Sequence, residues 1–132
     1  MVTREDLESY FIRMDAEYQE LEEGMYLVRT RAEGYPIVFN FSPPLLLLRM
    51  KVMDLPEEQG SLELYRTLLE LNATDVVHGA YGLEDGELIL SDTLELGTLD
   101  FEEVQASVES IQLAASGHMA RIRDMAGETS GS

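Results

Sequence analysis

Residues 71–96, LNATDVVHGAYGLEDGELILSDTLEL, form the stretch that decides how the rest of the chain folds. At its centre stands Glu84-Asp85-Gly86-Glu87, a turn signal, because Gly takes positive φ angles without steric cost and Asp tolerates them. Apolar residues alternate with their neighbours on both sides of this turn, as in strands that bury one face. The pattern predicts a β-hairpin with strands over residues 77–83 and 88–96.

A long helix is predicted directly after the hairpin. Asp100 and Glu103 form a capping box at its start. Apolar residues then recur at near-heptad spacing as far as Met125, which predicts one buried stripe that can fold back onto the hairpin. Residues 127–132 have nothing to pack, so we expect a disordered C-terminal tail.

A first helix is predicted at the start of the chain. Thr3 and Asp6 resemble a capping box, and apolar residues then recur at spacings of three and four until Leu21. Gly24 follows this run, and a glycine just past a periodic stretch is a common stop signal. We therefore expect an amphipathic helix over residues 4–21.

Three strands are predicted to follow this helix as an antiparallel meander. Turn signals separate them, AEG at residues 32–34 and SPP at residues 42–44. The strands are expected at residues 25–31, 35–41 and 45–54.

The third strand and the helix after it carry more apolar residues than one buried face requires. Residues 45–48 are four consecutive leucines, which predicts a strand covered on both faces near its start. The next helix is expected from Pro56-Glu57-Glu58 to about Asn72, with a wide apolar face. Soluble proteins rarely expose large apolar patches, so a partner subunit or the chain's own core must cover these residues. The candidate dimer or partner surface is Leu45, Leu46, Leu47, Leu48, Leu64, Leu68 and Leu71, with the intrachain core as the alternative.

The predicted element order is therefore α-β-β-β-α-β-β-α in one α+β domain over residues 1–126. Runs of strands between separate helices are typical of an antiparallel sheet with helices packed on it. The chain of 132 residues shows no internal repeat or linker, and its length suits a single core.

Composition narrows the classes of partner. Nine Lys and Arg stand against 26 Asp and Glu, for a net charge of −17. Nucleic acids and anionic membranes are bound by clustered positive charge, so a basic or neutral protein is the expected partner, although the charge could also serve solubility alone. No apolar run approaches the roughly 18 residues of a membrane span. The chain has no cysteine and no signal-peptide pattern, which fits a cytoplasmic protein.

Catalytic groups are scarce, and the sequence does not predict an enzyme, a cofactor or a metal site. His118 lies on the buried stripe of the last helix and is interpreted as a boundary histidine with a hydrogen bond, and His78 as a surface residue of the hairpin. Carboxylates cluster at residues 54–58 and 84–87, where helix capping and turn formation explain them. The alternative function is a regulatory module in which these two clusters contact a small ligand or cation.

Several phrases resemble a known family. They are LLELN at residues 68–72, the hairpin at 78–90, TLEL at 93–96 and LDFEE at 99–103. In these phrases and in its element order the chain resembles the type III secretion chaperone-like proteins, nearest the YbjN-like families, some of which are described as sensory transduction regulators. The resemblance implies helices over a curved antiparallel sheet, a homodimer and no enzymatic activity. It also implies an acidic, chaperone-like or adaptor function, in which the dimer holds an extended polypeptide segment on apolar patches.

Overall fold

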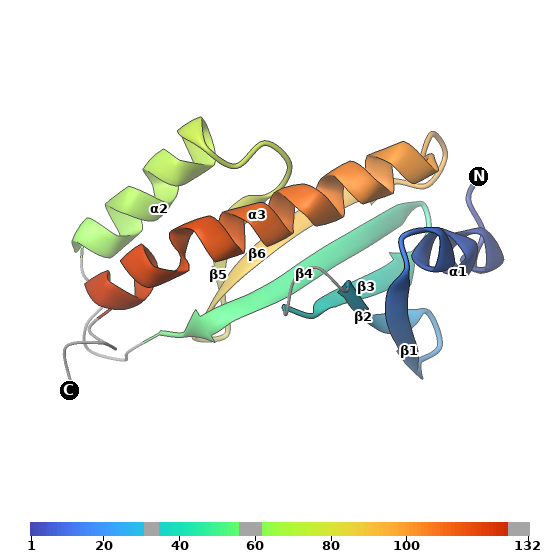
Figure 1. Ribbon diagram of the computed structural model, residues 1–132, viewed down its shortest axis with the longest axis horizontal. Coiled ribbons are helices and arrows are strands. Elements are labelled where there is room, and N and C mark those ends of the chain that lie inside the picture. The colour runs from blue at the N-terminus through green and yellow to red at the C-terminus, as the bar shows by residue number, and fades with distance from the viewer. Residues whose placement is uncertain (31–34, 56–61, 127–132) are drawn as a thin grey trace.

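Six antiparallel strands in the order β1-β2-β3-β4-β6-β5 form one curved sheet, and three helices pack on it (Figure 1). The computed structural model describes residues 1–30, 35–55 and 62–126, and these counts refer to that part of the chain. The α+β class predicted from the sequence is confirmed. The elements are α1 (Arg4–Arg13), β1 (Ala16–Glu22), β2 (Met25–Thr30), β3 (Ile37–Ser42), β4 (Leu45–Asp54), α2 (Leu62–Thr74), β5 (Ala80–Glu84), β6 (Glu87–Glu95) and α3 (Phe101–Met125).

The predicted hairpin is confirmed as β5 and β6. Asp85 and Gly86 form its two-residue turn with φ angles of 51° and 78°, both in the left-handed region that Asp and Gly accept. Tyr81 pairs with Leu90 across the hairpin. The first strand is shorter than predicted, because it begins at Ala80 and residues 76–79 belong to the loop after α2.

The predicted helix over residues 4–21 is wrong in its second half. The helix α1 ends at Arg13, Asp15 has a φ of 58°, and residues 16–22 form the additional strand β1, which pairs with β2. The Tyr18 ring lies 5.1 Å from the Phe11 ring, and the two residues meet across the turn between α1 and β1. Gly24 is therefore the turn between β1 and β2, with a φ of 80°.

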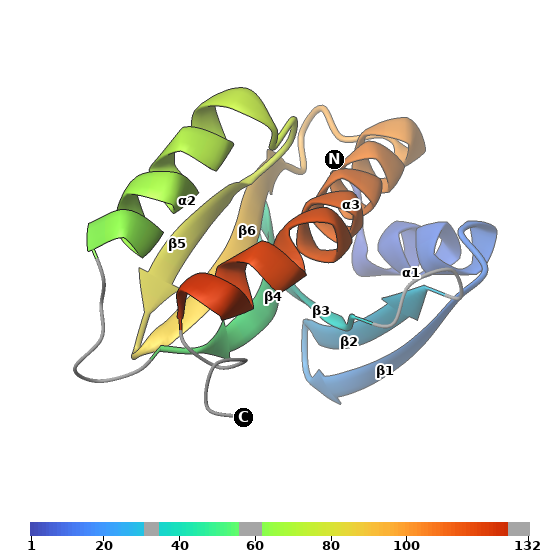
Figure 2. The ribbon, with the colours of Figure 1, turned by 60° about the vertical axis from the view of Figure 1, so that its left-hand side comes forward.

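All three helices lie on the same side of the sheet, which two views of the ribbon show (Figures 1 and 2). From β4, the side chains of Leu46, Leu48 and Met50 face these helices and are fully buried. The Phe11 ring of α1 lies 5.0 Å from the Phe39 ring of β3. The hydrophobic core thus lies between the helices and one face of the sheet, and no helix among the described residues lies over the other face.

The capping box predicted for the last helix is confirmed. The Asp100 side chain accepts from the Glu103 N–H at 2.8 Å, and the Glu103 side chain accepts from the Asp100 N–H at 3.2 Å. The helix α3 then runs without interruption through Gly117. The predicted turn at 32–34, the first turn of the second helix at 56–58 and the tail at 127–132 lie outside the described residues.

Candidate functional site

The seven leucines predicted as a partner surface fall into two groups. Leu45 and Leu47 alternate with the buried residues of β4, so they lie on the sheet face opposite the helices, where they are half-buried. The other five are at most 4% exposed within this chain and take the role of intrachain core, which the sequence left open as the alternative. These five are Leu46, Leu48, Leu64, Leu68 and Leu71.

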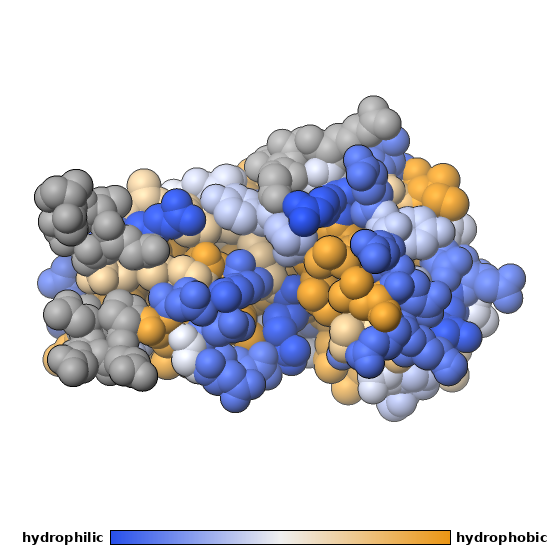
Figure 3. Space-filling model, turned by 90° about the horizontal axis from the view of Figure 1, so that it is seen from below, coloured by the Kyte–Doolittle hydropathy of each residue, from blue (hydrophilic) through white to orange (hydrophobic). Residues whose placement is uncertain are grey.

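The helix-free face of the sheet carries an apolar area, which we call the outer-face patch and define as Leu27, Val38, Leu45 and Leu47. Leu27 of β2 lies directly opposite Val38 of β3, and Leu47 of β4 pairs with Asn40, two residues from Val38. All four side chains are half-buried. Figure 3, which views the molecule from the side away from α2 and α3, shows apolar side chains surrounded by hydrophilic ones. Three neighbouring strands therefore contribute to one continuous apolar surface.

Sequence reasoning located only the β4 part of this patch. The contributions of Leu27 and Val38 were missed, although a signal was present, because both belong to short apolar runs, YLV and IVF, rather than to an alternating pattern. Which residues of such a run face the helices depends on the register of the sheet, and a single sequence does not give it.

A second apolar surface lies at the β5 edge of the sheet, and we call it the α2–β5 surface. Its exposed members are Leu62 and Leu69 on α2 and Leu83 on β5, which are 82%, 70% and 54% exposed. A shallow cavity of about 170 Å³ between α2 and β5 is lined by Leu69, Leu83 and their neighbours. Leu62 and Leu69 lie seven residues apart, so they share one side of the helix.

The backbone edge of β5 is partly closed by a side chain from α2. The Tyr81 N–H donates to Asn72 Oδ1 at 2.7 Å, and Asn72 Nδ2 donates to the Tyr81 carbonyl at 3.2 Å. Both backbone groups of Tyr81 are thus occupied, which prevents another strand from pairing with this residue. Association at this edge must therefore rely on the apolar side chains.

Three of the carboxylates predicted as possible ligand contacts, Asp54, Glu84 and Glu87, pair with cationic side chains on the sheet. Glu84 pairs with Arg49 at 3.1 Å, and Lys51 pairs with both Asp54 at 3.0 Å and Glu87 at 3.2 Å. Hydrogen bonds from Lys51 to these two carboxylates raise the pKa of the Lys51 amine. In the described ranges no three His, Cys, Asp or Glu side chains are grouped so that they could hold a metal ion. Glu57 and Glu58 lie outside the described residues.

His118 joins three elements, which confirms its interpretation as a boundary histidine with a hydrogen bond. The Tyr81 hydroxyl lies 2.7 Å from His118 Nδ1, and His118 Nε2 lies 3.2 Å from Asp75 Oδ2. Hydrogen bonds from His118 and Thr74 lower the pKa of the Asp75 carboxyl, and burial raises the pKa of the Tyr81 hydroxyl. His118, Tyr81 and Asp75 thus connect α3 to β5 and to the end of α2.

His78 lies in the loop after α2, not in a strand as predicted, and its side chain is exposed. The Ser110 hydroxyl of α3 accepts from the His78 N–H at 2.9 Å and donates to the His78 carbonyl at 3.1 Å. Sequence reasoning missed Ser110 and Asp75, and it had no signal for them, because their partners stand 32 and 43 residues away in the chain.

The described helices include none that is long and apolar enough to cross a membrane.

Comparison with known proteins identifies the family. The CesT_Tir_1 family model matches residues 2–128. One chain of the heterodimeric ExoU-SpcU complex from the type III secretion system of Pseudomonas aeruginosa has a TM-score of 0.69 and 15% sequence identity, over 85% of this chain and 93% of that chain. YbjN from E. coli has a TM-score of 0.65 and 13% identity, over 91% and 93% of the two chains.

The structure of the Yersinia pestis type III secretion chaperone SycH in complex with a fragment of YscM2 also contains a similar chain. Its TM-score is 0.61 at 18% identity, over 84% of this chain and 94% of that chain. No curated protein matches the sequence closely enough to count as a relative. The shared fold and the nearly full-length match lead to one assignment: the chain belongs to the CesT_Tir_1 family of type III secretion chaperone-like proteins, with a YbjN-like fold.

Proposed function

We propose that the protein is a non-catalytic, chaperone-like module that acts in the cytoplasm as a homodimer and holds an extended segment of a client polypeptide. The observation that carries the proposal is the outer-face patch, which three strands build and no described helix covers (Figure 3). The family assignment supports a protein-binding function. So do the two similar structures determined as complexes, ExoU-SpcU and SycH with YscM2.

The patch suits an extended segment because its residues lie on neighbouring strands rather than in a deep pocket. Alternate side chains of an extended peptide lie on one side of its backbone, so they can follow Leu27, Val38 and Leu47 across the sheet. The protein has a net charge of −17, so a client segment that also carries basic residues would be attracted to it over a longer range.

The α2–β5 surface is the proposed homodimer contact. Leu69 and Leu83 line one cavity, and Leu62 shares the side of α2 that carries Leu69, so a two-fold axis would bring each copy of this surface against its counterpart. Asn72 occupies the backbone of Tyr81, so the two copies would meet through these leucines and not through a continuous strand pair at Tyr81. This contact leaves the outer-face patch of both subunits accessible.

A binding assay with an unfolded probe tests the client surface. The probe is fluorescently labelled lysozyme with carbamidomethylated cysteines, which stays unfolded and is basic, and anisotropy gives its Kd at physiological salt. Fully burying a leucine is worth roughly 1.5–3 kcal/mol, and about 1.4 kcal/mol is a factor of ten in Kd. We therefore expect Leu47→Ser or Val38→Ser to weaken binding about tenfold.

The matched control is Ile12→Ser, which removes an exposed apolar side chain from α1, outside the outer-face patch. Circular dichroism verifies that each variant is folded. An equal loss of binding in all three variants, or no loss in any, would contradict the proposal that the outer-face patch holds the client.

A further inference from the structure

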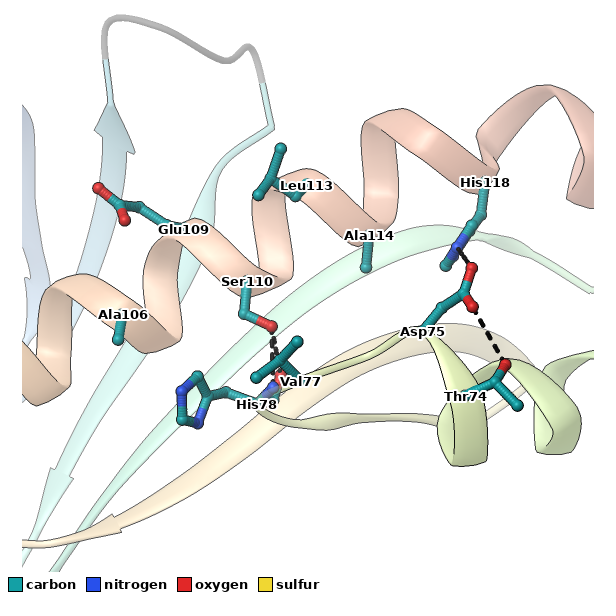
Figure 4. Close-up of a pocket in the computed structure, with 10 residues that line it drawn as sticks. All are labelled: Thr74, Asp75, Val77, His78, Ala106, Glu109, Ser110, Leu113, Ala114 and His118. Carbon is teal, nitrogen blue, oxygen red and sulfur yellow. Dashed lines mark hydrogen bonds and ion pairs between the residues drawn. The ribbon is translucent and has the colours of Figure 1, made fainter.

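A cleft of about 530 Å³ lies between α3 and the loop that follows α2, on the helix side of the sheet (Figure 4). It is therefore separate from the outer-face patch. Figure 4 shows Ala106, Ser110 and Ala114 pointing from α3 toward this loop, while Glu109 and Leu113 come from the adjacent side of the helix. Small side chains on the α3 wall leave the space open.

The walls of this cleft are held in place by side-chain and backbone contacts. One hydroxyl, that of Ser110, bonds both the N–H and the carbonyl of His78, which attaches the loop to the middle of α3. At the other end His118 Nε2 lies 3.2 Å from Asp75 Oδ2. Gly79 lets the loop approach β6, since a Cβ at Gly79 would lie 2.6 Å from the Ser91 carbonyl oxygen. A cleft fixed in this way needs little reorganisation to bind a partner.

Two exposed apolar side chains border the cleft from its opposite walls. Val77 of the loop is 80% exposed and Leu113 of α3 is 67% exposed. A single exposed apolar residue is ordinary on a protein surface, but two residues facing one cleft form an anchoring site for an apolar side chain.

The charges of the lining are complementary to a cation. Asp75 and Glu109 are the carboxylates among the described residues of the lining, and none of these described residues is Lys or Arg. The Asp75 carboxylate is already hydrogen-bonded to His118 and Thr74, and it also interacts electrostatically with Arg121. Among residues 1–30, 35–55 and 62–126, Glu109 has no hydrogen-bonding or ionic partner. Of the two carboxylates, Glu109 is therefore the one whose contacts within the described residues do not compete with an incoming charge.

We propose that this cleft binds a basic linear segment of a partner protein. One apolar side chain of the segment inserts between Val77 and Leu113, and a neighbouring Lys or Arg pairs with Glu109. A second copy of this chain suits the site less well, because both copies would carry a charge of −17. The inference goes beyond the proposed client surface and uses the opposite side of the sheet, so either can fail without the other.

Chemical-shift mapping tests the inference. Isotope-labelled protein is titrated to millimolar peptide at physiological salt with the blocked heptapeptide Gly-Lys-Arg-Leu-Arg-Lys-Gly, and in parallel with the same peptide carrying Ala in place of Leu. We expect saturable shifts confined to residues 74–79 and 106–118 with the first peptide, and at least about tenfold weaker binding of the second.

Variants separate the cleft from the general acidity of the protein. Leu113→Ser and Glu109→Lys are expected to weaken binding of the Leu peptide severalfold or more. The matched controls, Ile12→Ser and Glu23→Lys, make the same changes at exposed positions outside the cleft lining and are expected to leave its Kd within about twofold.

Three results would overturn the inference. The first is that both peptides bind equally, and the second is that Glu23→Lys weakens binding as much as Glu109→Lys, since either means diffuse charge attraction. The third is that shifts are absent at millimolar peptide or cluster elsewhere. Shifts that appear on concentrating the protein without peptide would instead assign the cleft to self-association.

Discussion

Asn72 of α2 hydrogen-bonds both backbone groups of Tyr81 on β5, accepting from its N–H at 2.7 Å and donating to its carbonyl at 3.2 Å. One side chain therefore does what a seventh strand would do at this residue. It attaches α2 to the sheet and at the same time closes the edge, which would otherwise present a free donor and acceptor to other chains.

Replacing Asn72 is expected to destabilise the protein through these two bonds. Asn72→Ala leaves the Tyr81 N–H and carbonyl without their partner, and the loss of such bonds costs about 1–3 kcal/mol of the free energy of unfolding. Urea denaturation followed by circular dichroism measures the change. Glu70→Ala, an exposed position on the same helix, is the control and should differ from wild type by less than about 0.5 kcal/mol. Equal stabilities of the two variants would show that the Asn72 bonds contribute nothing.

The α2–β5 surface predicts the oligomeric state and its sensitivity to charge. We expect the wild-type protein to be a dimer by light scattering, and Leu69→Glu or Leu83→Glu to give a folded monomer, because a carboxylate cannot be buried there without a partner. Ile12→Glu, which changes an exposed residue of α1, should remain dimeric. By contrast, Leu68→Glu places a charge at a 4% exposed core position and should unfold the chain. A monomeric wild-type protein would refute the homodimer.

The Asp75 contacts predict a pH dependence of stability with a definite sign. The pKa of the Asp75 carboxyl is lowered in the folded protein, first by the hydrogen bond from His118 and then by that from Thr74, with a smaller effect of Arg121. The folded state therefore binds fewer protons at Asp75 than the unfolded state just below the ordinary pKa of about 4. The contribution of the Asp75 contacts to the free energy of unfolding is fully present above about pH 4. It is lost as the pH falls through the lowered pKa of Asp75 in the folded protein.

Asp75→Asn isolates this effect. At neutral pH its urea midpoint should lie below that of wild type, and the difference should shrink as the pH falls below about 4, where wild-type Asp75 also becomes neutral. Asp54→Asn is the comparison, because it removes an exposed carboxylate that pairs with Lys51 and not with His118. A difference that grows toward low pH would have the wrong sign for the lowered pKa.

Replacing two glycines by alanine is expected to change the free energy of unfolding in opposite directions. Gly79 has a φ of 91° and its Cβ would meet the Ser91 backbone at 2.6 Å, so Gly79→Ala should cost roughly 1–3 kcal/mol and disturb the loop beside α3. Gly117 lies inside α3, and apart from the helix backbone and its chain neighbours nothing lies within 4 Å of the added Cβ, so Gly117→Ala should stabilise the protein by roughly 0.5–1 kcal/mol. Thermal unfolding of both variants and of wild type shows whether each substitution raises or lowers the stability. A stabilised Gly79→Ala protein would mean that the loop relaxes at no cost.

Local chemistry explains what could be predicted from the sequence. The Asp85-Gly86 turn and the Asp100–Glu103 cap depend on residues within one or three positions of each other, and both are present in the structure. The β1 strand could not be recognised because Phe11, Met14, Tyr18 and Leu21 have helical spacing, while six of its seven residues are exposed and show no alternation. Pairing with β2, a tertiary interaction, determines its conformation.

The candidate surfaces, too, could be predicted only in part, because they depend on tertiary structure. An excess of apolar residues in β4 and α2 is visible in the sequence, but the division into core and surface depends on which face the helices cover. Leu46 and Leu47 are adjacent and chemically identical, yet one is fully buried and the other half-exposed. The cleft beside α3 brings together segments about 32 residues apart, so no spacing rule could have predicted it.

The exposed character of β1 has a kinetic consequence. This strand pairs on one side only and six of its seven residues are exposed, so its detachment exposes less apolar surface than that of β4 or β6, which carry several buried apolar residues. Its amide protons should therefore exchange with solvent well before those of β4 and β6, which sit between two neighbours. We therefore expect β1 to detach transiently while the core stays folded, and during that interval β2, which carries Leu27 of the outer-face patch, would be the edge strand of the sheet.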